Sequence, residues 1–112
     1  VKIRTDASID GAWRGGDARF RVYNPATQAV LGEVPDFGAV ETEAAVAAAH
    51  SALPEWSART AKERGQVLRA WYDAMIADLD RLSRLITLEG GKPLTEARGE
   101  ARHGAAFIEW FG

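Results

Sequence analysis

The chain has 112 residues, of which 46% are hydrophobic and 27% charged, and its formal net charge at pH 7 is −2. This length suits one small domain and is too short for two. Lysine and arginine form no basic block, which argues against a nucleic-acid partner. The longest wholly apolar run, residues 44–49, is too short to span a bilayer.

The absence of cysteine excludes disulfides, thiolate metal ligands and a cysteine nucleophile within these 112 residues. It fits a cytoplasmic setting. The first residues lack the apolar core of a secretion signal. Residues 107–111 (FIEWF) continue an aromatic-rich helical pattern without a polar, capped end, so we expect the chain to be a segment of a larger protein.

The first third, residues 1–37, is predicted to form β structure. Asp10 and Gly11 stand between two short apolar stretches, the strongest short-range signal for a hairpin. Residues 19–23 alternate polar and apolar side chains as a half-buried strand does, and residues 29–34 supply the return strand. We expect an antiparallel hairpin of two longer strands with a short leading strand beside it.

The remainder, residues 38–112, is predicted to form about four helices. Gly38, followed three residues later by Glu41, marks the start of the first helix, and Pro54 is expected to end it. Thr60 and Glu63 form a capping box, in which each side chain satisfies a free backbone N–H of the other residue. These signals bound the first helix and begin the second.

The later helix boundaries rest on aspartate, glycine and proline. Asp78 or Asp80 is expected to restart a helix, and Gly90-Gly91 to stop it. Pro93 suits the first turn of the last helix, which carries small residues on the face that includes Ala97, Ala101 and Ala105. The residues alone therefore predict the α+β class, as a small domain or domain fragment with an N-terminal hairpin and about four helices.

Two candidate binding motifs have simpler structural explanations. His50 and His103 are far apart and belong to no zinc-binding spacing, so we interpret them as surface or partly buried helix residues. Gly90-Gly91-Lys92 lacks the longer glycine-spaced loop and the following serine or threonine of a phosphate-binding loop. No dinucleotide-binding fingerprint is present either.

The acidic and aromatic residues also favour structural interpretations. Glu96 and Glu100 lie one helical turn apart, where paired acids can share a proton or bind a cation. Basic residues nearby favour a solvated, salt-bridged face instead. The tryptophans stand at apolar-periodic positions or beside turns, which suits core or interface packing: Trp13, Trp56, Trp71 and Trp110.

Several segments together resemble the aldehyde dehydrogenase superfamily. Residues 9–13 (IDGAW) are similar to its opening motif, and residues 23–27 (YNPAT) with 31–35 (LGEVP) to its hairpin. Residues 88–97 (LEGGKPLTEA) resemble its most specific block in this region. The resemblance runs from residue 9 to residue 112. One departure is Gln28, at a hairpin position where the family usually has glycine, which accepts a positive φ more readily.

Three features resemble the succinate- and glutarate-semialdehyde branch: residues 60–64 (TAKER), 94–100 (LTEARGE) and 107–111 (FIEWF). The resemblance implies an NAD- or NADP-dependent oxidation of a small aldehyde by a homo-oligomeric enzyme with an α/β fold. In such enzymes a cysteine attacks the carbonyl, hydride passes to nicotinamide, and a glutamate activates water. These groups and the dinucleotide fold all follow the position of Gly112. No catalytic or cofactor-binding residue is therefore assigned here, and the chain alone is expected to be inactive.

The resemblance also implies a monovalent-cation site. Several members hold Na⁺ or K⁺ with two backbone carbonyls before the Asn-Pro turn and an acidic side chain before the Gly-Lys-Pro motif, which here are Val22, Tyr23 and Glu89. Oxygen ligands suit hard cations. The alternative is that Glu89 belongs to a surface helix end. By the same analogy Gly99, Arg102 and His103 line the substrate tunnel.

Two hypotheses follow. In the first, the chain is the N-terminal scaffold of a dehydrogenase that oxidises succinate semialdehyde or a near relative. In the second, it is a non-enzymatic helical interaction module or a truncated paralogue. The reading frame beyond Gly112 discriminates between them, because the enzyme needs a catalytic cysteine and a cofactor domain there.

Overall fold

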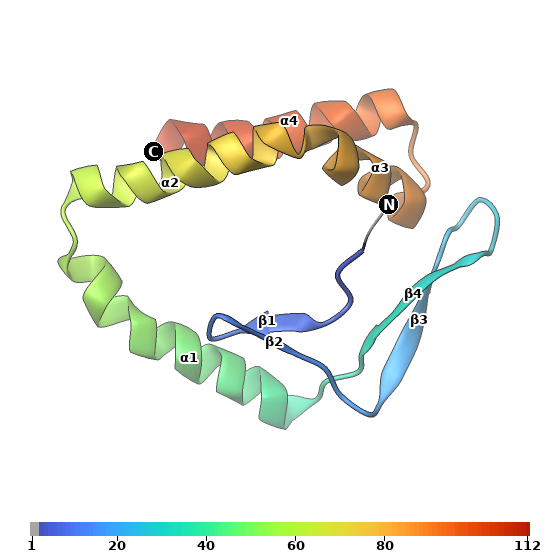
Figure 1. Ribbon diagram of the computed structural model, residues 1–112, viewed down its shortest axis with the longest axis horizontal. Coiled ribbons are helices and arrows are strands. Elements are labelled where there is room, and N and C mark those ends of the chain that lie inside the picture. The colour runs from blue at the N-terminus through green and yellow to red at the C-terminus, as the bar shows by residue number, and fades with distance from the viewer. Residues whose placement is uncertain (1–2) are drawn as a thin grey trace.

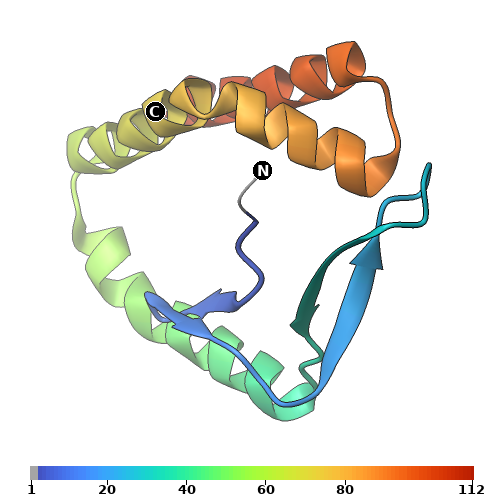
Figure 2. The same cartoon turned by 45° about the vertical axis from the view of Figure 1, so that its right-hand side comes forward.

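The computed structural model describes residues 3–112 and confirms the α+β class. Within them, four short strands precede four helices: β1 Ala7–Ile9, β2 Ala12–Arg14, β3 Arg19–Tyr23, β4 Val30–Pro35, α1 Ala39–Ala58, α2 Ala61–Ala77, α3 Leu79–Gly90 and α4 Leu94–Phe111. The elements lie around an open frame, with α2, α3 and α4 along one side and α1 and the strands along the others (Figures 1 and 2).

The first two strands form a hairpin of their own. β1 pairs antiparallel with β2, with Ala7 opposite Arg14. Asp10 (φ 53°) and Gly11 (φ 72°) both have positive φ, as the two-residue type I′ turn requires. The predicted turn is confirmed. The predicted placement of a leading strand beside the longer hairpin is wrong, because the tight turn directs the chain straight back onto β1 and the two hairpins form separate sheets.

The longer hairpin, β3 with β4, follows the prediction closely. Arg19 lies opposite Pro35, and an ion pair of 3.1 Å joins Arg21 to Glu33 across the strands, which raises the pKa of the Arg21 guanidinium. Gln28 itself adopts a positive φ of 61° at the turn. Its side-chain amide donates a hydrogen bond to the Pro25 carbonyl oxygen (3.1 Å), which helps to hold a conformation that glycine reaches more easily.

Helix α1 begins where the sequence predicts and ends later. The Gly38 N–H donates to the Glu41 carboxylate at 3.0 Å. Pro54 does not end the helix, which continues to Ala58. A proline removes one N–H donor, and the last turn is held by other bonds: the Ser57 hydroxyl donates to the Pro54 carbonyl oxygen (3.1 Å). The helix stops at Arg59, immediately before the capping box of α2.

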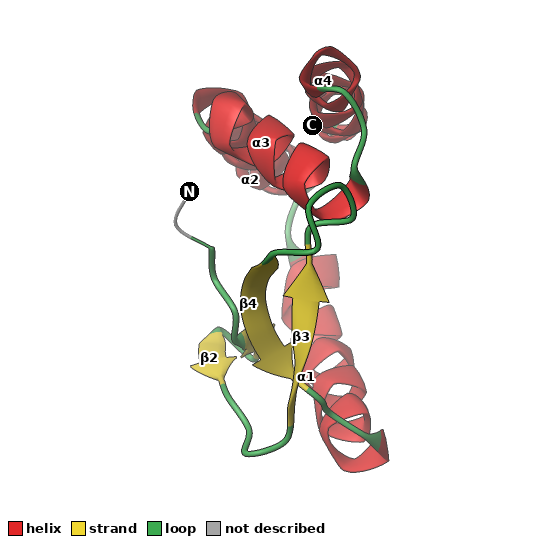
Figure 3. Ribbon diagram, turned by 90° about the vertical axis from the view of Figure 1, so that its right-hand side faces the viewer, coloured by secondary structure: helices red, strands yellow, loops and turns green. Residues whose placement is uncertain are grey.

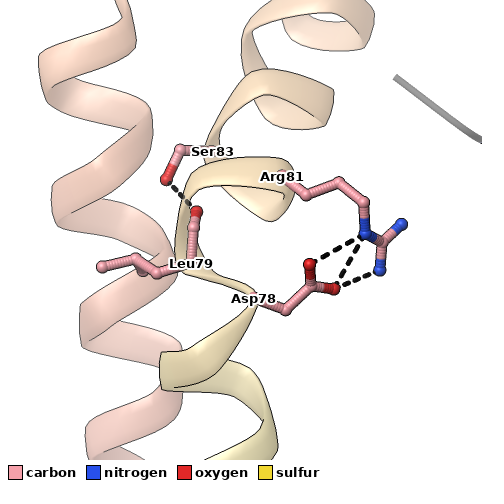
Figure 4. Close-up of polar contacts among 4 residues, drawn as sticks. All are labelled: Asp78, Leu79, Arg81 and Ser83. Atoms are coloured by element: carbon pink, nitrogen blue, oxygen red, sulfur yellow. Dashed lines mark hydrogen bonds and ion pairs between the residues drawn. The ribbon is translucent and has the colours of Figure 1, made fainter.

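The junctions of α2 and α3 rest on side-chain hydrogen bonds. The Glu63 N–H donates to the Thr60 hydroxyl (3.2 Å) and the Thr60 N–H to the Glu63 carboxylate (2.7 Å), which confirms the capping box. Asp78 separates α2 from α3, but its carboxylate does not cap the helix. It accepts the Arg81 guanidinium instead, at 2.8 Å from Nε, and this lowers the pKa of the aspartate (Figure 4).

The packed centre of the chain is small. Helix α4 lies against α3 and α2, and its small-residue face supplies the buried positions Ala97, Ala101 and Ala105. Ser83 is also buried, and its hydroxyl donates to the Leu79 carbonyl oxygen at 2.6 Å (Figure 4). Seen end-on, this helical layer lies opposite α1 and the strands, and the β3–β4 turn reaches towards it (Figure 3). None of the helices within residues 3–112 has the length and apolarity needed to cross a membrane.

Candidate functional site

The turn between β3 and β4 meets the end of α3. Gly91 closes that helix in the left-handed conformation (φ 77°), and its N–H donates to the Thr87 carbonyl oxygen at 2.9 Å. A Cβ atom added to Gly91 would lie 2.9 Å from Cγ of Pro25. The two segments are 66 residues apart in the chain and touch where both ribbons turn (Figure 2). Glycine is therefore needed at position 91 for two reasons, its backbone conformation and the space it leaves.

The strand pairing is irregular at the two residues whose carbonyls were assigned to a cation. Val22 lies opposite Gly32 and Tyr23 opposite Val30, so one residue of β4, Leu31, is left over at this step. Such a bulge disrupts the hydrogen-bonded ladder locally, and bulges are frequent beside functional sites. Neither the bulge nor the Pro25–Gly91 contact was predicted from the sequence. The only related signal in the sequence was the Gly90-Gly91 pair, which predicted the end of α3 where the contact forms.

Glu89 lies two residues before Gly91, near the end of α3. Its side chain is exposed, and it forms none of the ion pairs found among residues 3–112. It also lines a hollow between α3 and α4 together with Lys92 and Glu100. The contact of Pro25 with Gly91 thus brings the segments that carry Val22, Tyr23 and Glu89 to the same end of the molecule. Their oxygens are the donor type that a monovalent cation takes.

A second surface feature lies on the last turns of α4. An apolar hollow is lined by His103, Ala106, Phe107, Trp110 and Phe111. The rings of His103 and Phe107 meet edge to face with centroids 5.0 Å apart. Of the three residues assigned to a tunnel by resemblance, His103 lines this hollow, and Gly99 and Arg102 are exposed on the same helix.

The salt-bridged face that the sequence predicted on α4 is present in part, because Glu96 is in none of the ion pairs found among residues 3–112. Glu100 pairs with Lys92, and Arg98 of α4 pairs with Asp80 of α3. Among the residues that the structure describes, no three histidine, cysteine, aspartate or glutamate side chains gather as a metal cluster. Both ion pairs are solvent-exposed, so they contribute little to stability.

The tryptophans are not core residues of this chain. Trp13 and Trp71 are about half exposed, and Trp110 is 84% exposed, whereas Trp56 is intermediate. Their exposure is inconsistent with packing in the core of this chain. Packing at an interface is the predicted role that stays consistent with it.

Comparison with known proteins identifies the family. The model of the aldehyde dehydrogenase family matches residues 13–112. The chain is 52% identical over 112 residues to glutarate-semialdehyde dehydrogenase of Pseudomonas aeruginosa, covering 98% of this chain and 23% of that protein. It is also 52% identical to the NADP(+) succinate-semialdehyde dehydrogenase GabD of Escherichia coli, over 97% of this chain and 23% of that one.

A solved structure agrees with these relatives. The crystal structure of succinate-semialdehyde dehydrogenase from Burkholderia pseudomallei superposes with a TM-score of 0.92 at 49% identity, over 96% of this chain and 23% of that one. The chain belongs to the aldehyde dehydrogenase family. It spans about a quarter of the length of the curated relatives that it matches.

Proposed function

We propose that this chain is the N-terminal part of an NAD(P)-dependent aldehyde dehydrogenase that oxidises succinate semialdehyde to succinate, with glutarate semialdehyde as the nearest alternative substrate. The supporting observation is the 52% identity to dehydrogenases of both semialdehydes over nearly the whole chain. In this proposal the enzyme is a cytoplasmic homo-oligomer, and the bound dinucleotide accepts the hydride.

The role of these 112 residues in the enzyme is that of a scaffold. The chain has no cysteine, so it cannot form the thiohemiacetal through which the family's reaction is expected to pass. It also has no glycine-rich strand–helix turn to bind a pyrophosphate. The exposed apolar side chains of α4 suit packing against a further domain. The 52% identity to much longer dehydrogenases favours a scaffold over an independent interaction module.

The activity assay follows the absorbance of reduced cofactor with succinate semialdehyde and either NAD⁺ or NADP⁺. We expect turnover by the full-length protein and none by the 112-residue chain. Turnover by the chain alone would contradict the scaffold role. A full-length protein that oxidised acetaldehyde or betaine aldehyde but neither semialdehyde would contradict the substrate assignment and leave the family unchanged.

The proposal includes a monovalent-cation site made by the Val22 and Tyr23 carbonyl oxygens and the Glu89 carboxylate. It is supported by the contact between the β3–β4 turn and the end of α3 and by the bulge at Val22–Tyr23. The exposure of Glu89 fits the alternative of a surface helix end equally well. Na⁺ or K⁺ bound there would stabilise the junction of the hairpin and the helices, because a ligand that binds only the folded state raises its stability.

A further inference from the structure

The last turns of α4 are held by α2 on one side only. A Cβ atom added to Gly65 of α2 would lie 2.7 Å from the Gly112 carbonyl oxygen, so the two backbones approach closely there. An ion pair of 3.3 Å joins Arg69 of α2 to Glu109 of α4. None of the residues that line the apolar hollow on α4 takes part in these contacts. The end of α4 is therefore fixed in place while its aromatic side stays uncovered within residues 3–112.

Three aromatic side chains line the uncovered side: Phe107, Trp110 and Phe111. Their exposed fractions are 55%, 84% and 72%, so Trp110 has the most surface left to bury. The Phe107 ring already meets the His103 ring edge to face, which holds it in place before anything binds. No lysine, arginine, aspartate or glutamate lines the hollow. A group that enters it therefore removes no charge from water, and aliphatic or aromatic side chains suit it best.

The size of the hollow indicates what kind of partner covers it. Five residues on the last turns of one helix line it, whereas a stable interface between separate proteins takes roughly 20–30 residues and about 800 Å² on each side. Two separate copies of the chain also lose translational and rotational freedom when they associate. A segment of the same polypeptide is already at high local concentration, so a small apolar contact is enough to hold it.

We infer that the apolar hollow on α4 is the docking site for an apolar segment of the same polypeptide, one that follows Gly112 in the full-length protein, with Trp110 as the main anchor. The inference rests on the proposed function, in which this chain is the first part of a dehydrogenase; it covers 23% of the relatives that it matches. The hollow lies on the last turns of α4, so the polypeptide that follows starts beside it.

The experiment places the photoreactive amino acid p-benzoylphenylalanine at position 110 of the full-length protein, where it keeps an aromatic ring in the hollow. Irradiation links this ring to the groups that touch it. Denaturing electrophoresis separates links within one chain from links between two chains, and mass spectrometry of peptides locates the linked residue. We expect links within one chain, to apolar residues beyond position 112. A second variant carries the same amino acid at position 107 and should link to the same segment.

The control carries the photoreactive amino acid at Lys62, an exposed position of α2 outside the hollow, and should give no link to that segment. Equal linking from Lys62 would overturn the inference, because the contact would then not be specific to the hollow. Links between two chains from positions 107 and 110 would assign the hollow to a second copy. Links confined to residues 1–112, or no links in variants with the circular dichroism of the wild type, would show that no later segment docks there.

The dehydrogenase assay on the wild-type protein keeps this inference separate from the proposed function. Oxidation of succinate semialdehyde by a protein that gives no links would remove the docking site and leave the activity. Links to a segment beyond position 112 in a protein that oxidises neither semialdehyde would leave the docking site and remove the substrate assignment.

Discussion

At the start of α2, Thr60 and Glu63 illustrate how two side chains set a helix boundary. The Thr60 backbone N–H and then its hydroxyl donate to the Glu63 carboxylate, and these bonds lower the pKa of Glu63 below its usual 4.5. A carboxyl whose pKa is lower in the folded state stabilises that state fully above its unfolded pKa. The contribution is lost as the pH falls through the folded-state pKa.

Glu63 should therefore titrate below 4.5, and Thr60→Val should raise the midpoint towards 4.5. The hydroxyl donor is lost in this variant, whereas the backbone donor remains. Carbon NMR of the side-chain carboxyl measures both midpoints. Thr95→Val, at an exposed position in α4, is the control and should leave Glu63 unchanged. A wild-type midpoint at or above 4.5 would contradict the pKa direction.

Single residues also show where sequence reasoning succeeds. Asp10 and Gly11 specify their turn because both can take positive φ, and the strands beside them are adjacent in the chain. Gln28 does not have this signature, and its positive φ depends on the hairpin that surrounds it. The proposed cation ligands Val22 and Tyr23 were assigned by resemblance alone, because a backbone carbonyl leaves no mark in the sequence.

Among the elements, the boundaries set by local hydrogen bonds were predictable. The capping box and the Gly90-Gly91 stop involve residues within one turn of each other, and both are confirmed. The end of α1 was not predictable from Pro54. The helix continues to Ala58 because other hydrogen bonds, such as that from the Ser57 hydroxyl to the Pro54 carbonyl oxygen, hold its last turn although Pro54 has no N–H to donate. The separation of the two hairpins into different sheets and the Pro25–Gly91 contact depend on how distant segments meet, which no local pattern records.

The tight packing of α4 on its neighbours gives a prediction at the element scale. Ala105 is fully buried, whereas Ala106 is exposed. Ala105→Leu should destabilise the chain by about 1–3 kcal/mol, because the added methyl groups overpack a close helix contact. Ala106→Leu makes the same chemical change without this cost. Urea denaturation followed by circular dichroism at low protein concentration measures both, and equal costs would contradict the packing described here.

As a whole, the molecule exposes more surface than a compact protein of its size. The accessible surface is 8140 Å², whereas a folded monomer of 12.2 kDa is expected to expose about 6,100 Å². The radius of gyration of 16.6 Å also exceeds the roughly 13 Å typical of 112 residues. The surplus includes Phe107, Trp110 and Phe111 on α4. Exposed apolar surface of this kind is typical of a face that packs against a partner.

The isolated 112-residue chain should therefore self-associate or be loosely ordered. Burial of apolar surface contributes about 25 cal/mol per Å², so covering several hundred Å² outweighs a modest cost of association. Sedimentation velocity should show oligomers, and Trp110→Gln should reduce them more than Lys62→Gln, a change at an exposed polar position. A strictly monomeric chain with a sharp, cooperative calorimetric transition would contradict this prediction.

The two separate hairpins have a consequence for colloidal behaviour. Within residues 3–112 each sheet has only two strands, so every strand is an edge with unpaired backbone groups available to another chain. Charged residues and proline oppose such pairing: Arg14 ends β2, Arg19 and Arg21 alternate along β3, and Pro35 ends β4. These residues oppose strand-to-strand aggregation when the strand edges are exposed to solvent. Replacing the arginines with neutral residues would therefore favour fibrils over defined oligomers.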